Sequence, residues 1–391
     1  MDKGYIARQI EQEIRAMAGD YPVVTLIGPR QSGKTTLAKH LFPEKPYYTL
    51  ESADIRALAE ADPRRFLEGH QQGMIIDEVQ RAPQLLSYIQ EYVDAHQNQQ
   101  KGQFILTGSH QLELSAAITQ SLAGRTALLT LFPLSLYEAK NIIADWSLDQ
   151  ILLHGGFPRV YRDDLNPTKA YRNYFHTYVE RDVRKIINIK EMALFEKFIK
   201  LCAGRVGQLI NFQSLASDTG VSYHTIENWL SILEASFIIF RLQPYFENFG
   251  KRLIKSSKLY FTDVGLAAYL LGIENEQQMA RDPLRGGLFE NLVILELMKS
   301  RLNKGLDPQL YFFRDQRGNE VDIIYKSANT LVPVEIKAGQ TFHREFLKGL
   351  DYFKKIVGDR FAQGFLIYSG ELEQIMHDVT LLNYRDAIQV V

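Results

Sequence analysis

One run near the N-terminus constrains this chain more than any other. It lies between an apolar stretch at residues 23–27 and a helix-compatible stretch at residues 37–41. Its spacing, Gly-x4-Gly-Lys-Thr between a strand and a helix, predicts a phosphate-binding loop of the Walker A pattern. Glycines let backbone N–H groups converge on phosphate oxygens, and the helix that begins near Gly33 directs its positive end at them. The run comprises Gly28, Pro29, Arg30, Gln31, Ser32, Gly33, Lys34, Thr35 and Thr36.

This loop and a second run predict how ATP and Mg²⁺ are held. Lys34 is expected to reach the β- and γ-phosphates, and the Thr35 hydroxyl to ligate Mg²⁺. The second run, residues 74–78, is apolar and ends in Asp77 and Glu78, as in a Walker B strand. Asp77 would hold Mg²⁺, directly or through water, and Glu78 would orient and polarise the attacking water. The alternative for these two acids is a helix-capping pair.

Two further stretches supply candidate catalytic residues. Residues 104–109 have the pattern of a buried strand that ends in small polar residues, and we expect its end beside the Walker B strand. Thr107 or Ser109 could then sense the γ-phosphate or the lytic water; the alternative is a plain strand-to-loop transition. Arg125 precedes a fifth apolar strand at residues 127–131 and could act as a finger toward a neighbouring subunit's ATP. A surface or salt-bridge arginine is the alternative.

Composition limits the remaining possibilities. The 391 residues allow two or three domains, and 46% hydrophobic with 23% charged residues is typical of a globular chain. A net charge of -1 excludes a global basic field, so nucleic acid would need a local basic patch. The one cysteine, Cys202, excludes an internal disulfide framework. We find no signal-peptide pattern and no apolar window of about 18 residues, so we expect a cytoplasmic protein without a membrane partner.

The order of these motifs resembles a family. In bacterial and archaeal AAA-type ATPases of this kind, the ATPase domain precedes a nuclease-like C-terminal domain of unknown function. The resemblance implies an ATPase, and it covers essentially the whole chain. In better-known AAA ATPases the first sensor is usually Asn, so the choice between Thr107 and Ser109 stays open. Further motifs that carry the resemblance are Asp62-Pro63 with Phe66-Leu67, Leu122-Ala123-Gly124-Arg125, Phe132-Pro133-Leu134-Ser135, Gly155-Gly156-Phe157-Pro158 and Arg181-Asp182-Val183.

The middle of the chain predicts two helical modules. Residues 133–192, with helices at 134–144, 148–154 and 169–187, are expected to form a lid over the nucleotide. Arg181 and Arg184 could contact phosphate from this lid, or they could form a solvated basic face. Residues 193–262 predict a winged helix: helices at 194–203, 212–219 and from the cap Ser222 to about 234, then strands at 237–242 and 258–261.

The winged helix has residues suited to DNA, although such modules also pack protein against protein. Its third helix exposes polar side chains that could reach bases or phosphates, and its wing would form a local basic patch. The helix residues are Tyr223, His224, Thr225 and Asn228, and the wing residues are Lys251, Arg252, Lys255 and Lys258.

The C-terminal residues 263–391 show the element order of restriction-endonuclease-like cores. A helix at 286–297 is followed by strands at 310–314, 320–325 and 331–337, a helix from about 343 and a strand at 364–368. Asp322 and Glu335 match the Asp…Glu-x-Lys motif and are hard oxygen ligands for Mg²⁺. Lys337 shares a strand face with Glu335 and could polarise a metal-bound water, and Glu290 could add a metal contact. A Glu–Lys pair on a non-catalytic domain is the alternative.

The sequence therefore predicts an α/β protein. A P-loop NTPase core of the AAA type (1–132) would carry a helical lid (133–192), a winged-helix module (193–262) and an α/β restriction-endonuclease-like domain (263–391). The first hypothesis is ATP hydrolysis coupled to DNA processing by the C-terminal parts. The second is a nucleotide-dependent switch or scaffold whose inactive nuclease-like domain binds a protein partner. A homo-oligomer, in which Arg125 acts in trans, is compatible with both.

Overall fold

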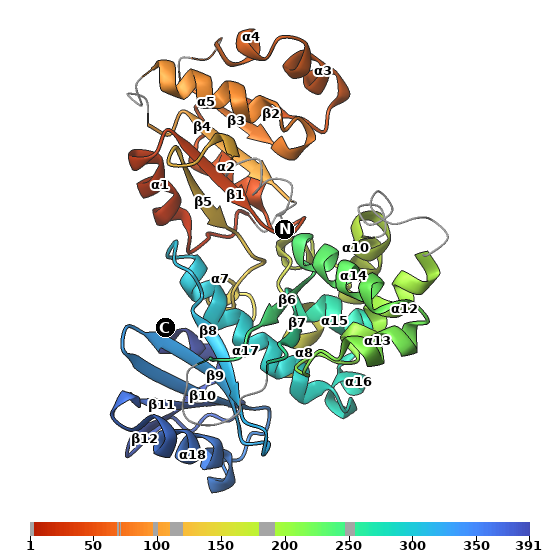
Figure 1. Ribbon diagram of the computed structural model, residues 1–391, viewed down its shortest axis with the longest axis vertical. Helices are drawn as coiled ribbons and strands as arrows, with labels where there is room; N and C mark the ends of the chain where they lie inside the picture. The colour runs from red at the N-terminus through yellow and green to blue at the C-terminus, as the bar shows by residue number, and fades with distance from the viewer. Residues whose placement is uncertain are drawn as a thin grey trace.

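The computed structural model describes residues 4–68, 70, 72–96, 101–109, 120–179, 192–246 and 255–391. Figure 1 shows an α/β part at the top, a mainly helical middle part at the right and a second sheet at the lower left. Arg181, Arg184, Lys251 and Arg252 lie outside the described residues. Among the helices of the described residues, none combines the length and the apolarity that a membrane crossing needs.

The N-terminal part is built on a parallel five-stranded sheet of order β2-β3-β4-β1-β5. The strands predicted near residues 23–27, 74–78, 104–109 and 127–131 are confirmed as β1 (Val23–Ile27), β3 (Met74–Asp77), β4 (Phe104–Gly108) and β5 (Thr126–Thr130). Residues 47–50, whose sequence also predicts a short strand, form β2 (Tyr47–Thr49). β1 is buried on both faces, as its unbroken apolar run requires. Because all strands run the same way, the carboxyl ends of β1, β3 and β4 meet at one edge.

Helices cover both faces of this sheet. α1 (Glu11–Asp20) and α2 (Lys34–Leu41) share one apolar core with Val24 and Leu26 of β1, whereas Val23 and Ile27 belong to the core on the other face. That face is covered by α4 (Pro63–Glu68) and α5 (Leu85–Ala95), with α3 (Ala53–Ala61) and the short η1 (Val79–Arg81) nearby.

Two helices are shorter than their sequences predict. Apolar residues at helical spacing (Ile6, Ile10, Ile14 and Met17) predict a helix over residues 5–18. It begins only at Glu11, because Arg8 donates its N–H to Glu11 Oε1 (2.7 Å) and its side chain reaches elsewhere. The helix expected over 134–144 is reduced to α7 (Leu136–Ala139). Tertiary partners hold the backbone groups of Leu134 and Leu136 there, so a longer helix cannot form.

The middle part has the expected order of helices and a strand pair. It contains α8 (Leu148–His154), α9 (Pro158–Arg162), α10 (Pro167–Tyr174), a π-helical turn η2 (Phe175–Val179), α12 (Met192–Ala203), α13 (Phe212–Thr219), α14 (Tyr223–Ala235), β6 (Ile239–Leu242), β7 (Lys258–Phe261), α15 (Val264–Leu270) and α16 (Glu276–Arg281). Ser222 caps α14 by accepting the Thr225 N–H at 3.1 Å. β6 and β7 pair antiparallel as a hairpin.

The C-terminal part is a mixed sheet of order β12-β13-β11-β10-β9-β8. The helices α17 (Arg285–Leu302) and α18 (Lys348–Val357) pack against it, and three short turns complete it: η4 (Arg344–Leu347), η5 (Gly358–Arg360) and η6 (Tyr384–Val390). The expected strands are present as β8 (Leu310–Arg314), β9 (Glu320–Ser327), β10 (Thr330–Lys337) and β11 (Gly364–Tyr368). The analysis of the sequence missed β12 (Gln374–Met376) and β13 (Val379–Asn383).

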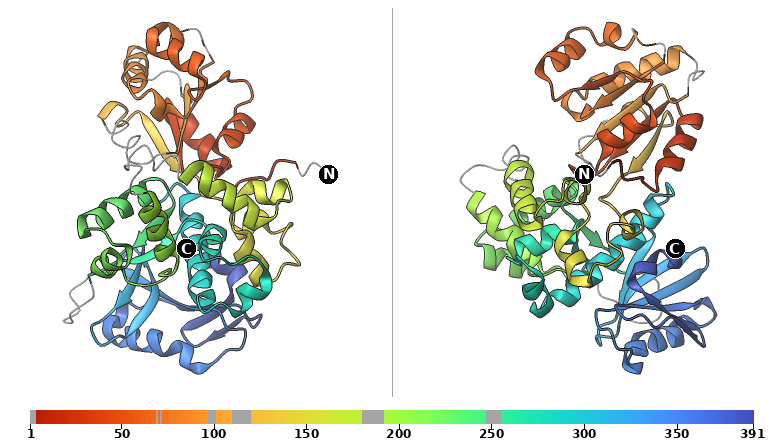
Figure 2. Two further views of the ribbon diagram at one scale, coloured as in Figure 1. Left: turned by 90° about the vertical axis from the view of Figure 1, so that its right-hand side faces the viewer. Right: turned by 180° about the vertical axis from the view of Figure 1, so that it is seen from behind.

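Figure 2 shows one end of α17, coloured cyan, close to the N-terminal part, and buried polar contacts join the two. Glu296 of α17 accepts the Leu136 N–H at 2.7 Å, and Lys299 Nζ donates to the Leu134 carbonyl at 2.7 Å. Glu296 and Lys299 also pair with each other at 3.0 Å. The two residues therefore satisfy the backbone just before and within α7 and form a buried ion pair of their own.

Arg8 joins three segments of the N-terminal part. Its guanidinium is buried and donates to the carbonyls of Ser32 (2.8 Å) and Phe132 (2.7 Å). It also lies 3.1 Å from Glu138 Oε1, whose side chain is equally buried. The contact connects the N-terminal segment, the phosphate loop and α7.

Replacing Arg8 by Met should lower the free energy of unfolding by about 3 kcal/mol, because it leaves the buried Glu138 carboxylate without its counter-ion. The thermal midpoint measured by calorimetry should fall clearly. Arg15→Met, at an exposed position of α1, is the matched control and should change the midpoint little. Equal midpoints for the two variants would contradict the structural role given to Arg8.

Candidate functional site

The predicted phosphate loop connects β1 to α2 in a conformation that requires glycine. Gly28 has a φ of 148°, and a Cβ there would lie 2.1 Å from the Leu131 carbonyl oxygen. Gly33 has a φ of 97° and stands at the N-terminus of α2. The spacing of the motif thus follows from two backbone positions that other residues would strain.

Lys34 is buried at the centre of the loop. Its Nζ donates to the carbonyls of Gly28 (2.9 Å) and Pro29 (2.8 Å). Burial lowers the pKa of this ammonium to about 8, although the carboxylates of Glu78 and Asp77 oppose the shift. The side chain is thus held over the loop by carbonyl groups that are much weaker partners than a phosphate would be.

Asp77 and Thr35 meet at the carboxyl edge of the sheet. Thr35 Oγ1 donates to Asp77 Oδ1 at 2.8 Å, and the Tyr47 hydroxyl donates to Oδ2 at 2.8 Å. Thr107 also donates to Asp77. A threonine hydroxyl and a carboxylate are hard oxygen donors of the kind that Mg²⁺ prefers, so the residues present fit that ion.

Glu78 lies beside this pair at a strained backbone position. Its φ is 57°, and its Oε2 accepts from Ser109 Oγ at 3.0 Å and from the amide of Gln80. The amide of Gln80 lies 3.2 Å from Ser109 Oγ as well. The two sensor candidates thus have different partners: Thr107 donates to Asp77 and accepts the Glu78 N–H at 3.4 Å, whereas Ser109 contacts the Glu78 carboxylate. Gln80 was not singled out from the sequence, because no motif position marks it.

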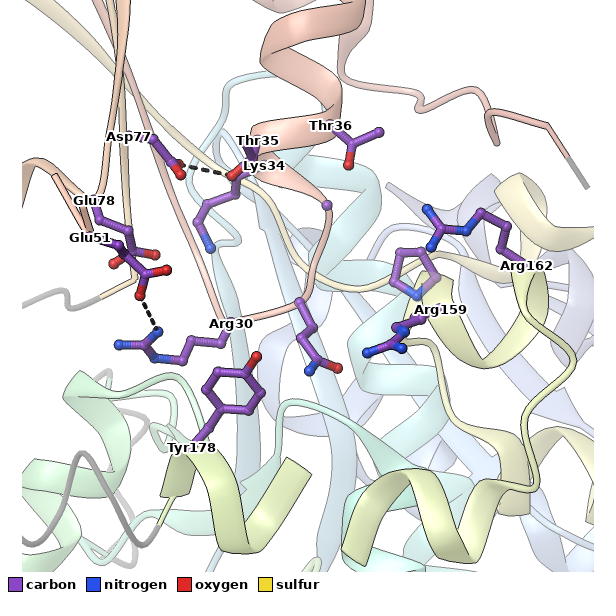
Figure 3. Close-up of a pocket in the computed structure, with 13 residues that line it drawn as sticks. Arg30, Lys34, Thr35, Thr36, Glu51, Asp77, Glu78, Arg159, Arg162 and Tyr178 are labelled. Atoms are coloured by element: carbon purple, nitrogen blue, oxygen red, sulfur yellow. Dashed lines mark hydrogen bonds and ion pairs between the residues drawn. The ribbon is translucent and has the colours of Figure 1, made fainter. Parts of the chain in front are cut away.

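Lys34, Thr35, Asp77 and Glu78 line one cavity of about 360 Å³, which Figure 3 shows. It brings together residues of the loop, both acids and side chains from α9 and η2 of the middle part. Its lining consists of Arg30, Gln31, Gly33, Lys34, Thr35, Thr36, Glu51, Asp77, Glu78, Pro158, Arg159, Arg162 and Tyr178. Gly28, Pro29 and Ser32 do not line it; Ser32 is buried and gives its carbonyl to Arg8.

Arg159 and Arg162 are the cationic residues that the sequence analysis missed. They lie on α9, which begins at Pro158 directly after the Gly155-Gly156 turn. Arg159 pairs with Asp163 at 2.9 Å, and Figure 3 shows both guanidinium groups on the loop's side of α9. The available signal was a Gly-Gly-Phe-Pro turn followed by arginine, which sequence alone connects to no ligand.

A second cavity of about 390 Å³ adjoins the first and shares Gly33, Thr36, Pro158 and Arg162 with it. The N-terminal segment forms much of its wall. Tyr5, whose ring stacks on His40 with centroids 3.8 Å apart, lines it together with Ile6. This cavity is more apolar than the first.

Arg125 lies elsewhere. Its guanidinium binds both carboxylate oxygens of Asp94, at 2.7 and 2.9 Å, and it does not line the first cavity. Within one chain it thus forms a salt bridge, as the alternative interpretation states. Its action on a neighbouring subunit stays a prediction.

The structure brings Asp322, Glu335 and Lys337 together in the C-terminal part. Lys337 Nζ lies 2.8 Å from Glu335 Oε2 and 3.2 Å from Asp322 Oδ2. Burial raises the pKa of Glu335, and the nearby Asp322 carboxylate raises it further, to well above its ordinary range. Among the described residues, however, no three His, Cys, Asp or Glu side chains are arranged to hold a metal ion.

One prediction about this region is wrong, and a second stays a prediction. Lys258, expected in an exposed basic wing, is buried with 2% of its surface accessible. Its Nζ lies 2.9 Å from Glu290 Oε1, so the residue expected to contact a metal binds an ammonium in this structure, and its metal role stays a prediction. The packing of β7 against α17, which no local pattern reveals, brings the two residues together.

The exposed face of α14 is polar and not basic. Tyr223 is 43% exposed, and His224 lies 3.7 Å from Glu227. Together with the burial of Lys258, this leaves Lys255 as the described member of the expected basic patch that remains exposed.

Three family models match the chain in order. An AAA domain matches residues 20–140, and two domains of unknown function match 145–277 (DUF8612) and 285–386 (DUF4143). The uncharacterized protein Rv2008c of Mycobacterium tuberculosis is 32% identical over 324 residues, which is 82% of this chain and 71% of that protein. The uncharacterized protein Mb2031c of Mycobacterium bovis gives the same values.

Two more distant similarities each cover about two thirds of this chain. An uncharacterized protein of Haemophilus influenzae is 26% identical over 67% of this chain and 64% of its own length. Among solved structures, the Walker-type ATPase paby2304 of Pyrococcus abyssi is 14% identical, with a TM-score of 0.46 over 68% of this chain and 96% of that chain. The family assignment depends on the sequence matches and not on this structure.

The affinity for ATP should fall as the pH rises above about 8. In the free protein the pKa of Lys34 is about 8, and adjacent phosphates would raise it, so binding takes up a proton once the free lysine is neutral. The Kd should then increase by up to about tenfold per pH unit, measured by titration with a fluorescent ATP analogue. Lys34→Arg, which stays charged, should show no such increase. A constant wild-type Kd from pH 7 to pH 9.5 would contradict the assignment.

Proposed function

Because the chain belongs to the family of AAA-domain proteins that includes Rv2008c and Mb2031c, we propose that it binds ATP with Mg²⁺ and hydrolyses it. One observation carries this proposal: Lys34 and Thr35 of the loop and Asp77 and Glu78 at the end of β3 come from two segments that are distant in the sequence and line one cavity. A triphosphate bound along the loop would meet the positive end of α2 and the ammonium of Lys34.

Each residue has a distinct part in this proposal. Thr35 and Asp77 would hold Mg²⁺, which supplies a positive charge that stabilises the transferring phosphoryl group. Glu78 orients the attacking water and receives its proton. Ser109 and Gln80 fix the Glu78 carboxylate by hydrogen bonds, so they are positioning residues.

The middle part would act as a lid over the nucleotide. Arg159 and Arg162 face the loop from α9, where a guanidinium can bind phosphate oxygens with two N–H groups. The adjoining cavity, with Tyr5 and Ile6, offers an apolar and aromatic wall suited to the base. The sequence predicts phosphate contacts from Arg181 and Arg184 of this lid. In the proposal, α9 of the same lid adds further contacts.

Glu78→Gln should reduce the turnover of ATP at least 100-fold, because an amide cannot accept the proton of the attacking water. The Kd for ATP should stay within about threefold of the wild-type value, because the loop and Lys34 are unchanged. Phosphate release measures the first quantity, and titration with a fluorescent analogue measures the second. Glu60→Gln, at an exposed position of α3, is the matched control. Wild-type turnover by Glu78→Gln would exclude this residue as the base.

The second candidate function is a nucleotide-dependent switch whose C-terminal part binds a protein partner. The burial of Lys258 and the polar character of the exposed α14 residues, which include Glu227 but no lysine or arginine, favour it over DNA processing. DNA processing remains the alternative proposal, with the hairpin β6–β7 as the wing and Asp322, Glu335 and Lys337 as the nuclease residues.

The switch hypothesis predicts that the protein releases phosphate from ATP without cutting plasmid or linear DNA in Mg²⁺. Its DNA affinity should be weak at physiological salt, with a Kd above about 10 µM in a polarisation assay, because few basic groups face solvent among the described residues of α14 and of the segment 239–261. Glu335→Ala should leave both results unchanged. DNA cutting by the wild type that disappears in Glu335→Ala would favour the DNA-processing proposal.

A further inference from the structure

Seven charged residues gather where the hairpin β6–β7 meets the C-terminal sheet. Six of them belong to α17, β8, β9 and β10, but the seventh, Lys258, comes from β7 of the middle part. The carboxylates are Glu290, Glu320, Asp322 and Glu335, and the cations are Lys258, Arg314 and Lys337.

Lys258 stands inside this cluster. Its side chain is 3% exposed, and its ammonium binds Glu290 and Glu320. Burial pulls the pKa of Lys258 down, but the carboxylates of Glu290, Asp322 and Glu320 together raise it above its ordinary value. The two ion pairs hold the ammonium in place between these carboxylates.

Several carboxylate oxygens of the cluster have further partners. Glu290 Oε1 also accepts from the Tyr260 hydroxyl, and Asp322 Oδ2 accepts from the Ile336 N–H at 2.8 Å and from Lys337. Glu320 Oε2 lies 3.0 Å from Arg314.

Two other carboxylate oxygens of the cluster lie close to the backbone of glycine residues. A Cβ at Gly349 of α18 would lie 1.9 Å from Glu335 Oε1, and a Cβ at Gly207 would lie 3.4 Å from Glu290 Oε2. The side chains of Asp322 and Glu335 are accordingly buried. A metal ion would have to find its ligands within this packed arrangement.

This arrangement does not fit the divalent ion that a nuclease-like domain implies. Three cations already face the four carboxylates, so an added Mg²⁺ would exceed the remaining negative charge. Mg²⁺ also needs oxygens at about 2.0–2.1 Å in octahedral geometry, and here Glu290 Oε1 is engaged by Nζ at 2.9 Å. An ion and the ammonium would compete for the same oxygens.

We propose that Lys258 is the resident cation of this cluster and that its ammonium keeps divalent metals away from Glu290 and Asp322. The middle part thereby holds the C-terminal acids in a metal-free state. Metal can enter only when the ammonium is withdrawn.

The hairpin is fastened to the C-terminal sheet independently of Lys258, which makes the proposal testable. The Tyr245 N–H donates to the Phe312 carbonyl at 2.7 Å, and the Phe312 N–H donates to the Gln243 carbonyl at 3.1 Å. The Tyr245 side chain is buried in the core of the C-terminal part. Removing the ammonium should therefore leave the hairpin in place.

The test is a titration with Mn²⁺, followed by electron paramagnetic resonance, on the full chain without nucleotide. All proteins carry Asp77→Asn, which removes the metal ligand of the nucleotide site. This background protein should bind no Mn²⁺ at the cluster. Adding Lys258→Ala should create one site at least tenfold tighter than any in the background, and adding Glu290→Gln to that variant should abolish it. Lys255→Ala, at an exposed position of the same segment, is the matched control and should create no site.

Two results would overturn the proposal. One is a Mn²⁺ site in the background protein that disappears on Glu290→Gln or Asp322→Asn, because metal and ammonium would then coexist. The other is a folded Lys258→Ala protein that gains no site, because the acids would then lack the geometry for metal whatever the cation. Lys258→Met, which keeps the length of the apolar stem, repeats the measurement if the alanine variant fails to fold. The background measurement alone can still refute the proposal.

Discussion

A single buried guanidinium sets the geometry on which the nucleotide site depends. Arg8 binds the carbonyl of Ser32 inside the phosphate loop, the carbonyl of Phe132 after β5 and the carboxylate of Glu138. A buried charge without such partners would cost several kcal/mol, so these three segments must keep their places together. The extended N-terminal segment, the loop and the start of α7 are therefore one unit, although they are distant in the sequence.

The same unit continues into the C-terminal part through α17. Glu296 and Lys299 bind the backbone on either side of Ser135, near one end of this helix. Glu290, nearer the other end, belongs to the charged cluster around Lys258. A change in the loop that displaces Arg8 would thus reach the linker before α7 and then α17 without crossing solvent. This continuity of buried polar contacts would be the physical basis for the nucleotide-dependent switch proposed above.

Local sequence patterns predicted most helices and strands. Tertiary contacts determine where several of their side chains lie. The loop and β1, β3 and β4 could be predicted because buried parallel strands are continuous apolar runs and because two loop positions require glycine. Glu78 and Asp77 follow from their place at the end of β3.

The features that the sequence did not predict correctly have a common origin in tertiary packing. Arg159 and Arg162 reach the loop only because α9 folds back over it, and Lys258 is buried only because β7 packs on α17. In the sequence, a lysine that will face solvent cannot be told from one that will bind two buried carboxylates, as Lys258 does. The late start of α1 likewise depends on where the Arg8 side chain finds its partners.

The position of α17 has a consequence for how such chains can evolve and be divided. The three family models end and begin near residues 140, 145, 277 and 285, yet the backbone of Leu134 and Leu136 is completed by a helix that belongs to the third match. A fragment that stops at the first boundary would expose these groups, and a chimera with a relative's C-terminal half would pair them with foreign side chains. The three segments are therefore expected to be inherited as one block, in which substitutions at positions 134–138 and 296–299 accompany each other.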